Sequence, residues 1–261
     1  PGNAGKAHPR KQNTGVKTRI GMTYGTFTGK IKFPELLNED NVWNGLTNAY
    51  WLFRQSGQAW NKRGECKGKG YVKKSGSDKK PEYVRRSSYS EIDIEIVKAS
   101  KYIKPKETEE DKDYDPAMSE NIIVACTNHD LACQEPEDFK SRRTEFQGHK
   151  FRTHRWYPTY RAKFLKTPVN ENEMFQRDFY YFQIEWRPDQ ITWRVGPTRN
   201  NMRVVGYMDE KTTKIPDNQM IVIVSQEFHH GDWWPTTPFH QDNIPYPKDD
   251  IVGIVYDIRA E

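Results

Sequence analysis

Three carboxylates at alternate positions, Glu91, Asp93 and Glu95, are the residues of this sequence best suited to chemistry. Successive side chains of a β-strand point to opposite faces, so the three acids would share one face and the isoleucines between them the other. Acidic residues are depleted in strands, and neighbouring carboxylates resist simultaneous ionisation. A strand that accepts this cost is suited to proton transfer or to binding a cation.

Glycoside hydrolysis needs two carboxyl groups, one protonated to assist the leaving oxygen and one ionised to attack the anomeric carbon. Glu91 and Glu95 would lie roughly 13 Å apart between Cα atoms on a flat strand, so a bent sheet is needed to bring their carboxyl groups together. Two other interpretations stay open at this point. The acids could form a solvated strand face, or they could contribute to a site for a hard cation such as calcium.

Alternating apolar and polar residues recur along the chain, whereas convincing helical periodicity does not. Besides the acidic strand, this alternation predicts strands at 24–33, 48–54, 121–127, 151–160, 179–186, 191–195, 220–224 and 251–258. The segment Arg187-Pro-Asp-Gln190 predicts a hairpin turn between two of them. We therefore expect one all-β domain over residues 1–261, built as a sandwich, with residues 1–18 forming a flexible N-terminal segment.

Charge and composition limit the classes of partner. The formal net charge is +5, but the basic residues gather locally, above all in the Lys- and Gly-rich insert 58–88, and an acidic insert follows at 101–120. Both inserts predict surface loops, and a nucleic-acid-binding surface is not required. No apolar run approaches the ~18 residues that a transmembrane helix needs. Three cysteines fix no disulfide framework, although Cys126 and Cys133 are close enough in sequence to pair.

Several motifs, in the same order along the chain, resemble glycoside hydrolase family 16. Glu91-Ile-Asp-Ile-Glu95 resembles the family's catalytic signature in its form without an inserted residue. Tyr24-Gly-Thr-Phe-Thr-Gly-Lys-Ile-Lys-Phe-Pro34, Asn48-Ala-Tyr-Trp-Leu-Phe53 and the segment 182–195 resemble three flanking strands of the family. The resemblance covers about residues 19–258. It implies a β-jelly-roll sandwich of two curved antiparallel sheets, like that of concanavalin A, with a concave substrate cleft.

The resemblance also implies a reaction and assigns roles to the acids. Glu91 would be the nucleophile, Glu95 the general acid and base, and Asp93 the assisting carboxylate of a retaining double displacement. The implied activity is internal cleavage of β-linkages in a polysaccharide, either a β-glucan or a galactan. The form of the motif favours a neutral mixed-linkage glucan, whereas the basic insert 58–88 favours an anionic, sulfated galactan. These two substrate classes stay open.

Further candidates would bind the sugar rather than react with it. Trp51, Trp233 and Trp234 are candidate stacking platforms, and His229 and His230 precede the last two without indicating a metal site. By position, the polar candidates are Asn128, His129, Gln226 and Glu227. The resemblance requires no cofactor. Structural calcium occurs on the convex face of such folds, but no segment here indicates its ligands.

Two related functions compete with hydrolysis. A transglycosylase on the same fold would pass the glycosyl group to a sugar hydroxyl instead of water, and a non-catalytic carbohydrate-binding protein would lack the acids. The retained acidic triplet favours an enzyme. We further expect a secreted or cell-envelope monomer, because polysaccharide substrates lie outside the cell.

Overall fold

The structure is a computed structural model that describes residues 14–36, 46–55, 89–98, 121–129, 141–157, 160–166, 173–228 and 249–261. These residues form two antiparallel β-sheets and a short 3-10 helix, η3 (Glu173–Phe175). The larger sheet has eight strands in the order β1-β12-β3-β4-β5-β8-β7-β6. Their bounds are β1 (Thr14–Lys17), β12 (Ile221–Phe228), β3 (Leu46–Gln55), β4 (Tyr89–Lys98), β5 (Asn121–His129), β8 (Tyr160–Lys166), β7 (His149–Tyr157) and β6 (Ser141–Phe146).

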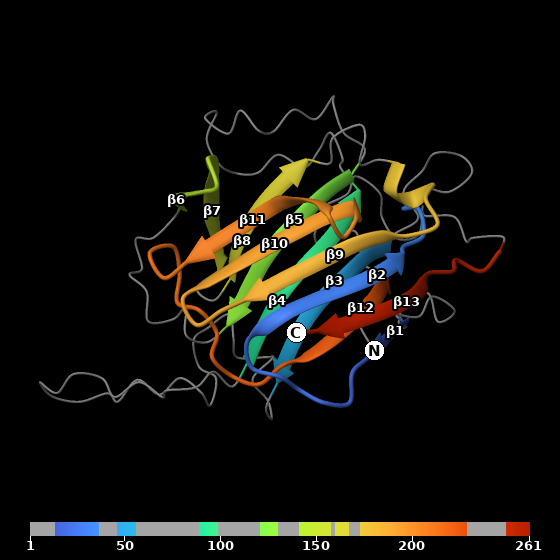
Figure 1. Cartoon of the computed structure of the whole chain (residues 1–261), viewed down its shortest axis with the longest axis horizontal. Helices are drawn as coiled ribbons and strands as arrows, with labels where there is room; N and C mark the ends of the chain where they lie inside the picture. The colour runs from blue at the N-terminus through green and yellow to red at the C-terminus, as the bar shows by residue number, and fades with distance from the viewer. Residues whose placement is uncertain are drawn as a thin grey trace, which may run out of the picture.

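The smaller sheet has five strands in the order β11-β10-β9-β2-β13. Their bounds are β11 (Asn201–Asp209), β10 (Gln190–Thr198), β9 (Tyr180–Trp186), β2 (Gly25–Lys32) and β13 (Ile254–Ala260). Figure 1 shows this sheet lying over the central strands of the larger one. The two sheets form the predicted β-jelly-roll sandwich.

One hydrophobic core fills the space between the sheets. Ile92, Ile94 and Ile96 of β4 are fully buried there, as are Trp186 and Trp193 of the smaller sheet. Alternation within β4 therefore works as the sequence predicts: the isoleucines anchor the strand, and the acids point to the opposite face of the larger sheet. Because β4 lies between β3 and β5, the acids stand in the middle of that face.

Most predicted strands are confirmed, with ends shifted by a few residues. The predicted turn at Arg187–Gln190 joins β9 to β10, and the Arg187 amide donates a hydrogen bond to the Gln190 carbonyl at 2.9 Å. The single strand expected at 151–160 is wrong. Its first part lies in β7, its last residue begins β8, and Tyr157 pairs with Tyr160 across the connection. The continuous apolar run 220–224 is typical of a strand buried on both faces, but Ile221 and Ile223 are only half-buried, on the side of the larger sheet that carries the acids.

Strands β1, β6 and β11, and β8 beyond its first residue, were not expected from the sequence. Residues Thr14–Lys17, within the N-terminal segment for which flexibility is expected, form β1 and pair with β12. Most of the inserts 58–88 and 101–120 lies outside the described residues. In the part of the chain that the structure describes, no helix has the length and apolar character needed to cross a membrane.

Candidate active site

The three predicted carboxylates lie on the face of the larger sheet that points away from the hydrophobic core. Pairing with β3 sets Glu91 opposite Phe53, Asp93 opposite Trp51 and Glu95 opposite Ala49. Asp93 is buried, whereas Glu91 and Glu95 are half-buried. We call this surface the acidic face, and it comprises the residues of the larger sheet that share the side of Glu91, Asp93 and Glu95.

Asp93 is the most enclosed of the three acids. Burial raises the pKa of its carboxyl group well above the ordinary value, and the charges of Glu91 and Glu95 raise the pKa further. Cys126, its partner on β5, donates a hydrogen bond from its thiol to Asp93 Oδ2 at 3.3 Å, which acts in the opposite direction. The net direction favours a protonated Asp93, which keeps a third negative charge off the strand.

Glu95 has the pKa expected of a general acid. Burial is the largest cause, and the charges of Glu227 and Glu91 add to it, raising the pKa of Glu95 to about 8. A carboxyl group with such a pKa holds its proton at neutral pH. Glu95 is therefore suited to protonating a leaving oxygen.

Glu91 is held by a neighbouring phenol. The Tyr89 hydroxyl, from the same strand and the same face, donates a hydrogen bond to Glu91 Oε1. Tyr89 is fully buried, so the phenol is a fixed donor. A donor of this kind orients one carboxylate oxygen and leaves the other for chemistry. The two glutamates of β4 thus have different environments, as a nucleophile and an acid require.

A fourth carboxylate, Glu227, joins the acidic face from β12. The Trp51 indole N–H donates to Ser225 Oγ at 3.1 Å, and the Ser225 hydroxyl donates to Glu227 Oε1 at 3.2 Å. These two hydrogen bonds join β3 to β12, and Ser225 pairs with Ala49, which pairs with Glu95, so they lie on the same face as Glu95. Burial raises the pKa of Glu227, while the hydrogen bond from Ser225 lowers it.

Aromatic rings form a row beside the acids. Trp51 and Phe53 have ring centroids 5.0 Å apart, and Phe53 meets Tyr89 edge-on at 5.9 Å. Trp51 is half-buried, which leaves part of its ring exposed on the acidic face opposite Asp93. Its N–H is committed to Ser225, and its role as a stacking platform stays a prediction.

The polar candidates from the sequence divide between the two faces of the sheet. Asn128 pairs with Glu91 and Glu227 follows Ser225 by two, so both lie on the acidic face. His129 pairs with Ser90, and Gln226 pairs with Asn48, so both lie on the core-facing side. Asn128 and His129 were expected to follow a strand, but β5 continues through both, and alternation turns His129 away from the acids.

His129 is accordingly a core residue. It is fully buried, and burial together with the charge of Arg161 lowers its pKa to about 3. A neutral, buried imidazole on the core-facing side of the sheet is not placed to contact a sugar on the acidic face. Trp233 and Trp234 lie outside the described residues, as do His229 and His230.

Sequence reasoning missed three side chains that shape the site, namely Tyr89, Cys126 and Ser225. Tyr89 could have been found by extending the alternation of β4 by two residues. The other two depend on which strands become neighbours. The buried Cys126 thiol faces Asp93, and Cys133, the partner considered from the sequence, lies outside the described residues.

Positive charge lies further along the same face. Asp93 pairs with Cys126, Cys126 with Ala162 and Ala162 with His154, which places His154 on the acidic face. Alternation along β7 adds Lys150 and Arg152 to this face, Arg143 of β6 pairs with Arg152, and Glu145 of β6 pairs with Lys150. We call Arg143, Lys150 and Arg152 the basic strip. With strands about 4.8 Å apart, β7 lies roughly 14 Å from β4.

No group of three or more His, Cys, Asp or Glu side chains suited to a metal ion occurs among the described residues. Ligands for the calcium considered from the sequence have no counterpart among these residues.

Replacing Glu227 by Gln should shift the pH dependence of activity. The charge of Glu227 raises the pKa of Glu95, so its removal lowers that pKa. Activity that requires a protonated Glu95 is lost as pH rises through this pKa, so the alkaline limb of the profile moves to lower pH, by about one unit. Rates measured between pH 4 and 10 check this. Glu210→Gln, in an exposed turn after β11, is the matched control, and an unchanged alkaline limb in Glu227→Gln would refute the coupling.

Comparison with known proteins supports the fold. No protein-family model matches the sequence, and no curated protein matches it. One similar solved structure is a glycoside hydrolase family 16 protein of a mixed-linkage glucan locus of Bacteroides ovatus, in complex with a G4G4G3G product. Its TM-score is 0.50 at 10% sequence identity, and the match covers 95% of this chain and 74% of that one. This likeness shows the shared fold.

Two further solved structures are similar at lower TM-scores. A κ-carrageenase from Pseudoalteromonas carrageenovora, in complex with a tetrasaccharide of κ-carrageenan, has a TM-score of 0.46 at 16% identity, covering 94% of this chain. The catalytic domain of a laminarinase from Thermotoga petrophila has a TM-score of 0.45 at 14% identity, covering 95% of this chain and 67% of that one. The chain spans 66% of the carrageenase's length.

Proposed function

We propose that this protein is an endo-acting, retaining glycoside hydrolase of family 16 that cleaves internal β-linkages of a polysaccharide. One observation carries the proposal: two half-buried glutamates on one strand differ in environment. Glu91 is oriented by the Tyr89 hydroxyl, while burial and neighbouring charge raise the pKa of Glu95 to about 8. This is the division between nucleophile and acid that retaining hydrolysis needs.

The reaction follows from these two environments. Glu91 attacks the anomeric carbon and forms a glycosyl ester, the bond to the leaving oxygen breaks, and Glu95 gives that oxygen its proton. Esterification removes the charge of Glu91, which is one of the causes that raise the pKa of Glu95. The pKa of Glu95 therefore falls, and its carboxylate takes a proton from the water that attacks the ester. The second step releases Glu91 and restores the proton on Glu95.

Asp93 and Glu227 support this exchange of protons. Burial and the flanking glutamates raise the pKa of Asp93, which favours its neutral form between them, and the Cys126 thiol donates to one of its oxygens. The charge of Glu227 raises the pKa of Glu95 and so favours the proton on Glu95 before substrate is cleaved. Trp51, held by Ser225, offers its exposed ring to a sugar unit, and Asn128 lies opposite Glu91.

The substrate that the acidic face suits best is an anionic polysaccharide. The basic strip lies on the same side of the sheet as the carboxylates, at a distance of several sugar units. Lysine and arginine side chains pair with sulfate groups through charge-assisted hydrogen bonds. A sulfated polymer could thus be held by Arg143, Lys150 and Arg152 while a linkage reaches Glu91. Such polymers lie outside the cell, which favours a secreted protein.

A panel of polysaccharides at two salt concentrations tests the function and the substrate together. We expect kcat/KM on a sulfated galactan to fall about tenfold between 20 and 200 mM salt, because salt screens exposed charges, and to change little on a neutral mixed-linkage β-glucan. Reducing-end release measures both rates. In a double variant, Arg143→Gln with Arg152→Gln, the salt dependence should weaken. Cleavage of neutral glucans alone, at a rate independent of salt, would contradict the anionic substrate, and failure to cut any polymer would contradict hydrolysis.

A further inference from the structure

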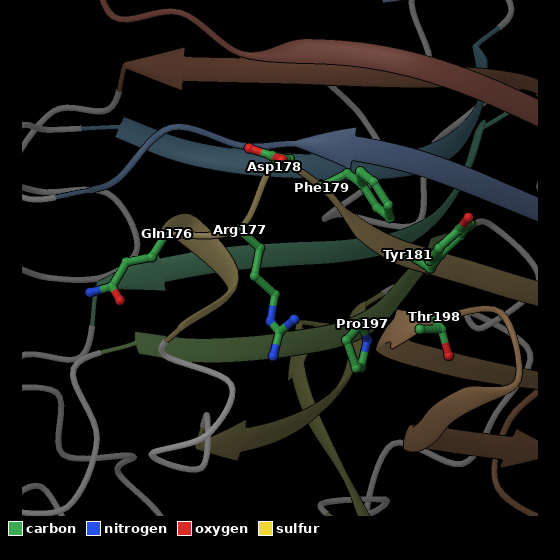
Figure 2. Close-up of a pocket in the computed structure, with 7 residues that line it drawn as sticks. All are labelled: Gln176, Arg177, Asp178, Phe179, Tyr181, Pro197 and Thr198. Atoms are coloured by element: carbon green, nitrogen blue, oxygen red, sulfur yellow. The ribbon is translucent and has the colours of Figure 1, made fainter.

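A cavity of about 540 Å³ opens on the smaller sheet, on the side of the sandwich opposite the acidic face. Figure 2 shows its lining, which joins the segment before β9 to the end of β10. Phe179 and Tyr181 supply aromatic rings, and Arg177, Asp178 and Thr198 supply polar groups. A cavity with a few polar groups beside aromatic surface is the usual form of a small-ligand site.

The rings of this cavity are presented to solvent by the sheet. Tyr181 alternates with the core residues Tyr180 and Phe182, so it lies on the outer face of β9, and it is half-buried. Phe179 lies 5.8 Å from Tyr181, edge to face. Lys30 places its ammonium group 3.8 Å from the centre of the Phe179 ring, which fixes that ring. Tyr181 therefore provides an ordered, partly open aromatic surface.

The strand next to Tyr181 leaves that surface open. Gly196 of β10 pairs with Tyr181, and a Cβ at this position would lie 2.0 Å from the Asn201 carbonyl oxygen. Only glycine fits such a close approach of backbone, so no side chain from β10 covers the Tyr181 ring at this point. Pro197 and Thr198 then form the wall beyond it, and Figure 2 shows Arg177 extending towards Pro197.

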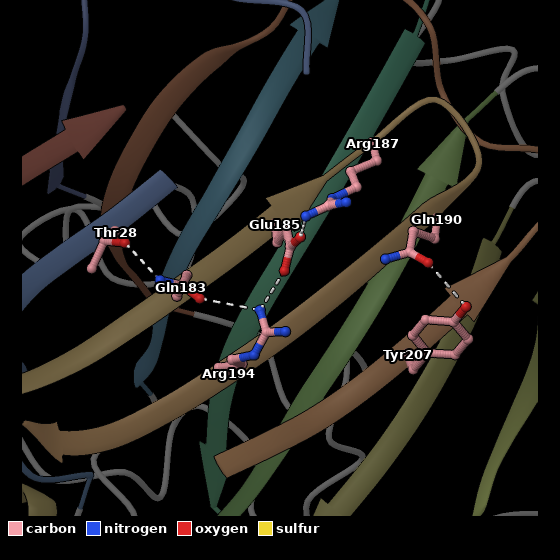
Figure 3. A network of polar contacts seen from close by, with 7 residues as sticks. All are labelled: Thr28, Gln183, Glu185, Arg187, Gln190, Arg194 and Tyr207. Carbon is pink, nitrogen blue, oxygen red and sulfur yellow. Dashed lines mark hydrogen bonds and ion pairs between the residues drawn. The ribbon is translucent and has the colours of Figure 1, made fainter. Parts of the chain in front are cut away.

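Beyond Tyr181, the outer face of β9 and β10 carries a network of polar contacts. Arg194 donates to Glu185 at 2.7 Å and to Gln183 at 3.2 Å, and Gln183 donates to Thr28 at 3.0 Å (Figure 3). Arg187 pairs with Glu185 from the other side. Burial acts to raise the pKa of Glu185, but the hydrogen bonds and charges of the two arginines outweigh it and lower that pKa. This network satisfies its own charges, which sets it apart from the aromatic cavity.

We propose that the cavity at Tyr181 is a second, non-catalytic carbohydrate-binding site that takes one or two sugar units of a polysaccharide chain. Sugar rings offer an apolar C–H face for an aromatic ring and hydroxyl groups at their edges for donors and acceptors. Tyr181 and Phe179 supply the aromatic surface, while Arg177, Asp178 and Thr198 supply donors and acceptors around it. A polymer bound here stays attached to the protein while another stretch is free to enter the acidic face.

Affinity electrophoresis in gels that contain polysaccharide tests the site. The parent is the inactivated variant Glu91→Gln, which does not digest the polysaccharide in the gel. The polysaccharides are a sulfated galactan, a neutral galactan, laminarin and mixed-linkage β-glucan. This choice of polymers rests on the proposed function. We expect at least one polymer to retard the parent. Adding Tyr181→Ala should weaken binding to that polymer about tenfold, and adding Tyr181→Phe should retain it.

The activity of Tyr181→Ala and a second variant, Arg177→Ala, separate the second site from the acidic face. In the otherwise unchanged protein, Tyr181→Ala should leave kcat on a short oligosaccharide within about twofold of the parent. If Tyr181→Ala fails to fold, Arg177→Ala is measured instead, because that side chain is exposed. Equal retardation of all variants by every polymer would overturn the second site. Binding that depends on Tyr181 without any hydrolysis would refute the proposed function alone.

Discussion

Glu91→Gln should abolish hydrolysis of every polysaccharide that the parent protein cuts, with kcat falling by at least about 10⁴-fold. The amide has nearly the shape of the carboxylate, but it cannot form a stable ester with the anomeric carbon. The hydrogen bond from the Tyr89 hydroxyl has an acceptor in either case, so the fold should be retained. Initial rates of reducing-end release measure the effect. Glu210→Gln, on an exposed turn, is the matched control for loss of one carboxylate and should retain parent activity.

Added azide sharpens the test of Glu91. In Glu91→Ala the space beside the anomeric carbon is vacated, and a small anion can attack from that side. A glycosyl azide of α configuration is then the expected product from an activated aryl β-glycoside. Full hydrolysis by Glu91→Gln would remove Glu91 from the mechanism, whatever the other acids do.

Glu95→Ala should lower kcat on polysaccharides by about 10³-fold, within the range that general acid catalysis supplies. The leaving sugar hydroxyl is poorly acidic and needs the proton that Glu95 holds because of its pKa of about 8. An aryl glycoside with an acidic phenol needs no such proton, so its first step should be nearly unaffected and a burst of phenol should appear. Azide should speed turnover and give a β-glycosyl azide, since Glu91 still forms the ester.

The pH profile adds a second readout for Glu95. The parent should lose activity as pH rises through about 8, where Glu95 releases its proton. Glu95→Ala should lack this alkaline limb on the aryl glycoside. Equal loss on both substrates, with the alkaline limb unchanged, would assign the acid to another residue.

The sequence was sufficient for the parts of the fold and site that depend on local alternation. The period of two along β4 predicts both the isoleucine anchor and the shared face of Glu91, Asp93 and Glu95, and both follow from the backbone of one strand. The same rule, carried two residues further, would have found Tyr89. Alternation also explains why His129 differs from Asn128, once the extent of β5 is known.

Long-range pairing could not be predicted in this way. Glu227 influences Glu95 because β12 lies beside β3, and nothing local to either residue indicates that neighbourhood. The basic strip likewise depends on the order β5-β8-β7-β6, and β8 was not recognised because Tyr157 and Tyr160 look like one continuous strand. The cysteine count did not indicate a role for Cys126, whose thiol donates to Asp93 across β4 and β5. These features arise only when the sheet assembles.

The anomeric configuration of the first product decides whether the two glutamates act as proposed. Proton NMR during the first minutes of hydrolysis distinguishes the β signal from the α signal before mutarotation mixes them. A double displacement through Glu91 inverts the anomeric carbon twice, so the β signal should appear first and the α signal should grow later. An α product at the earliest times would mean a single displacement by water, and it would contradict a glycosyl ester on Glu91.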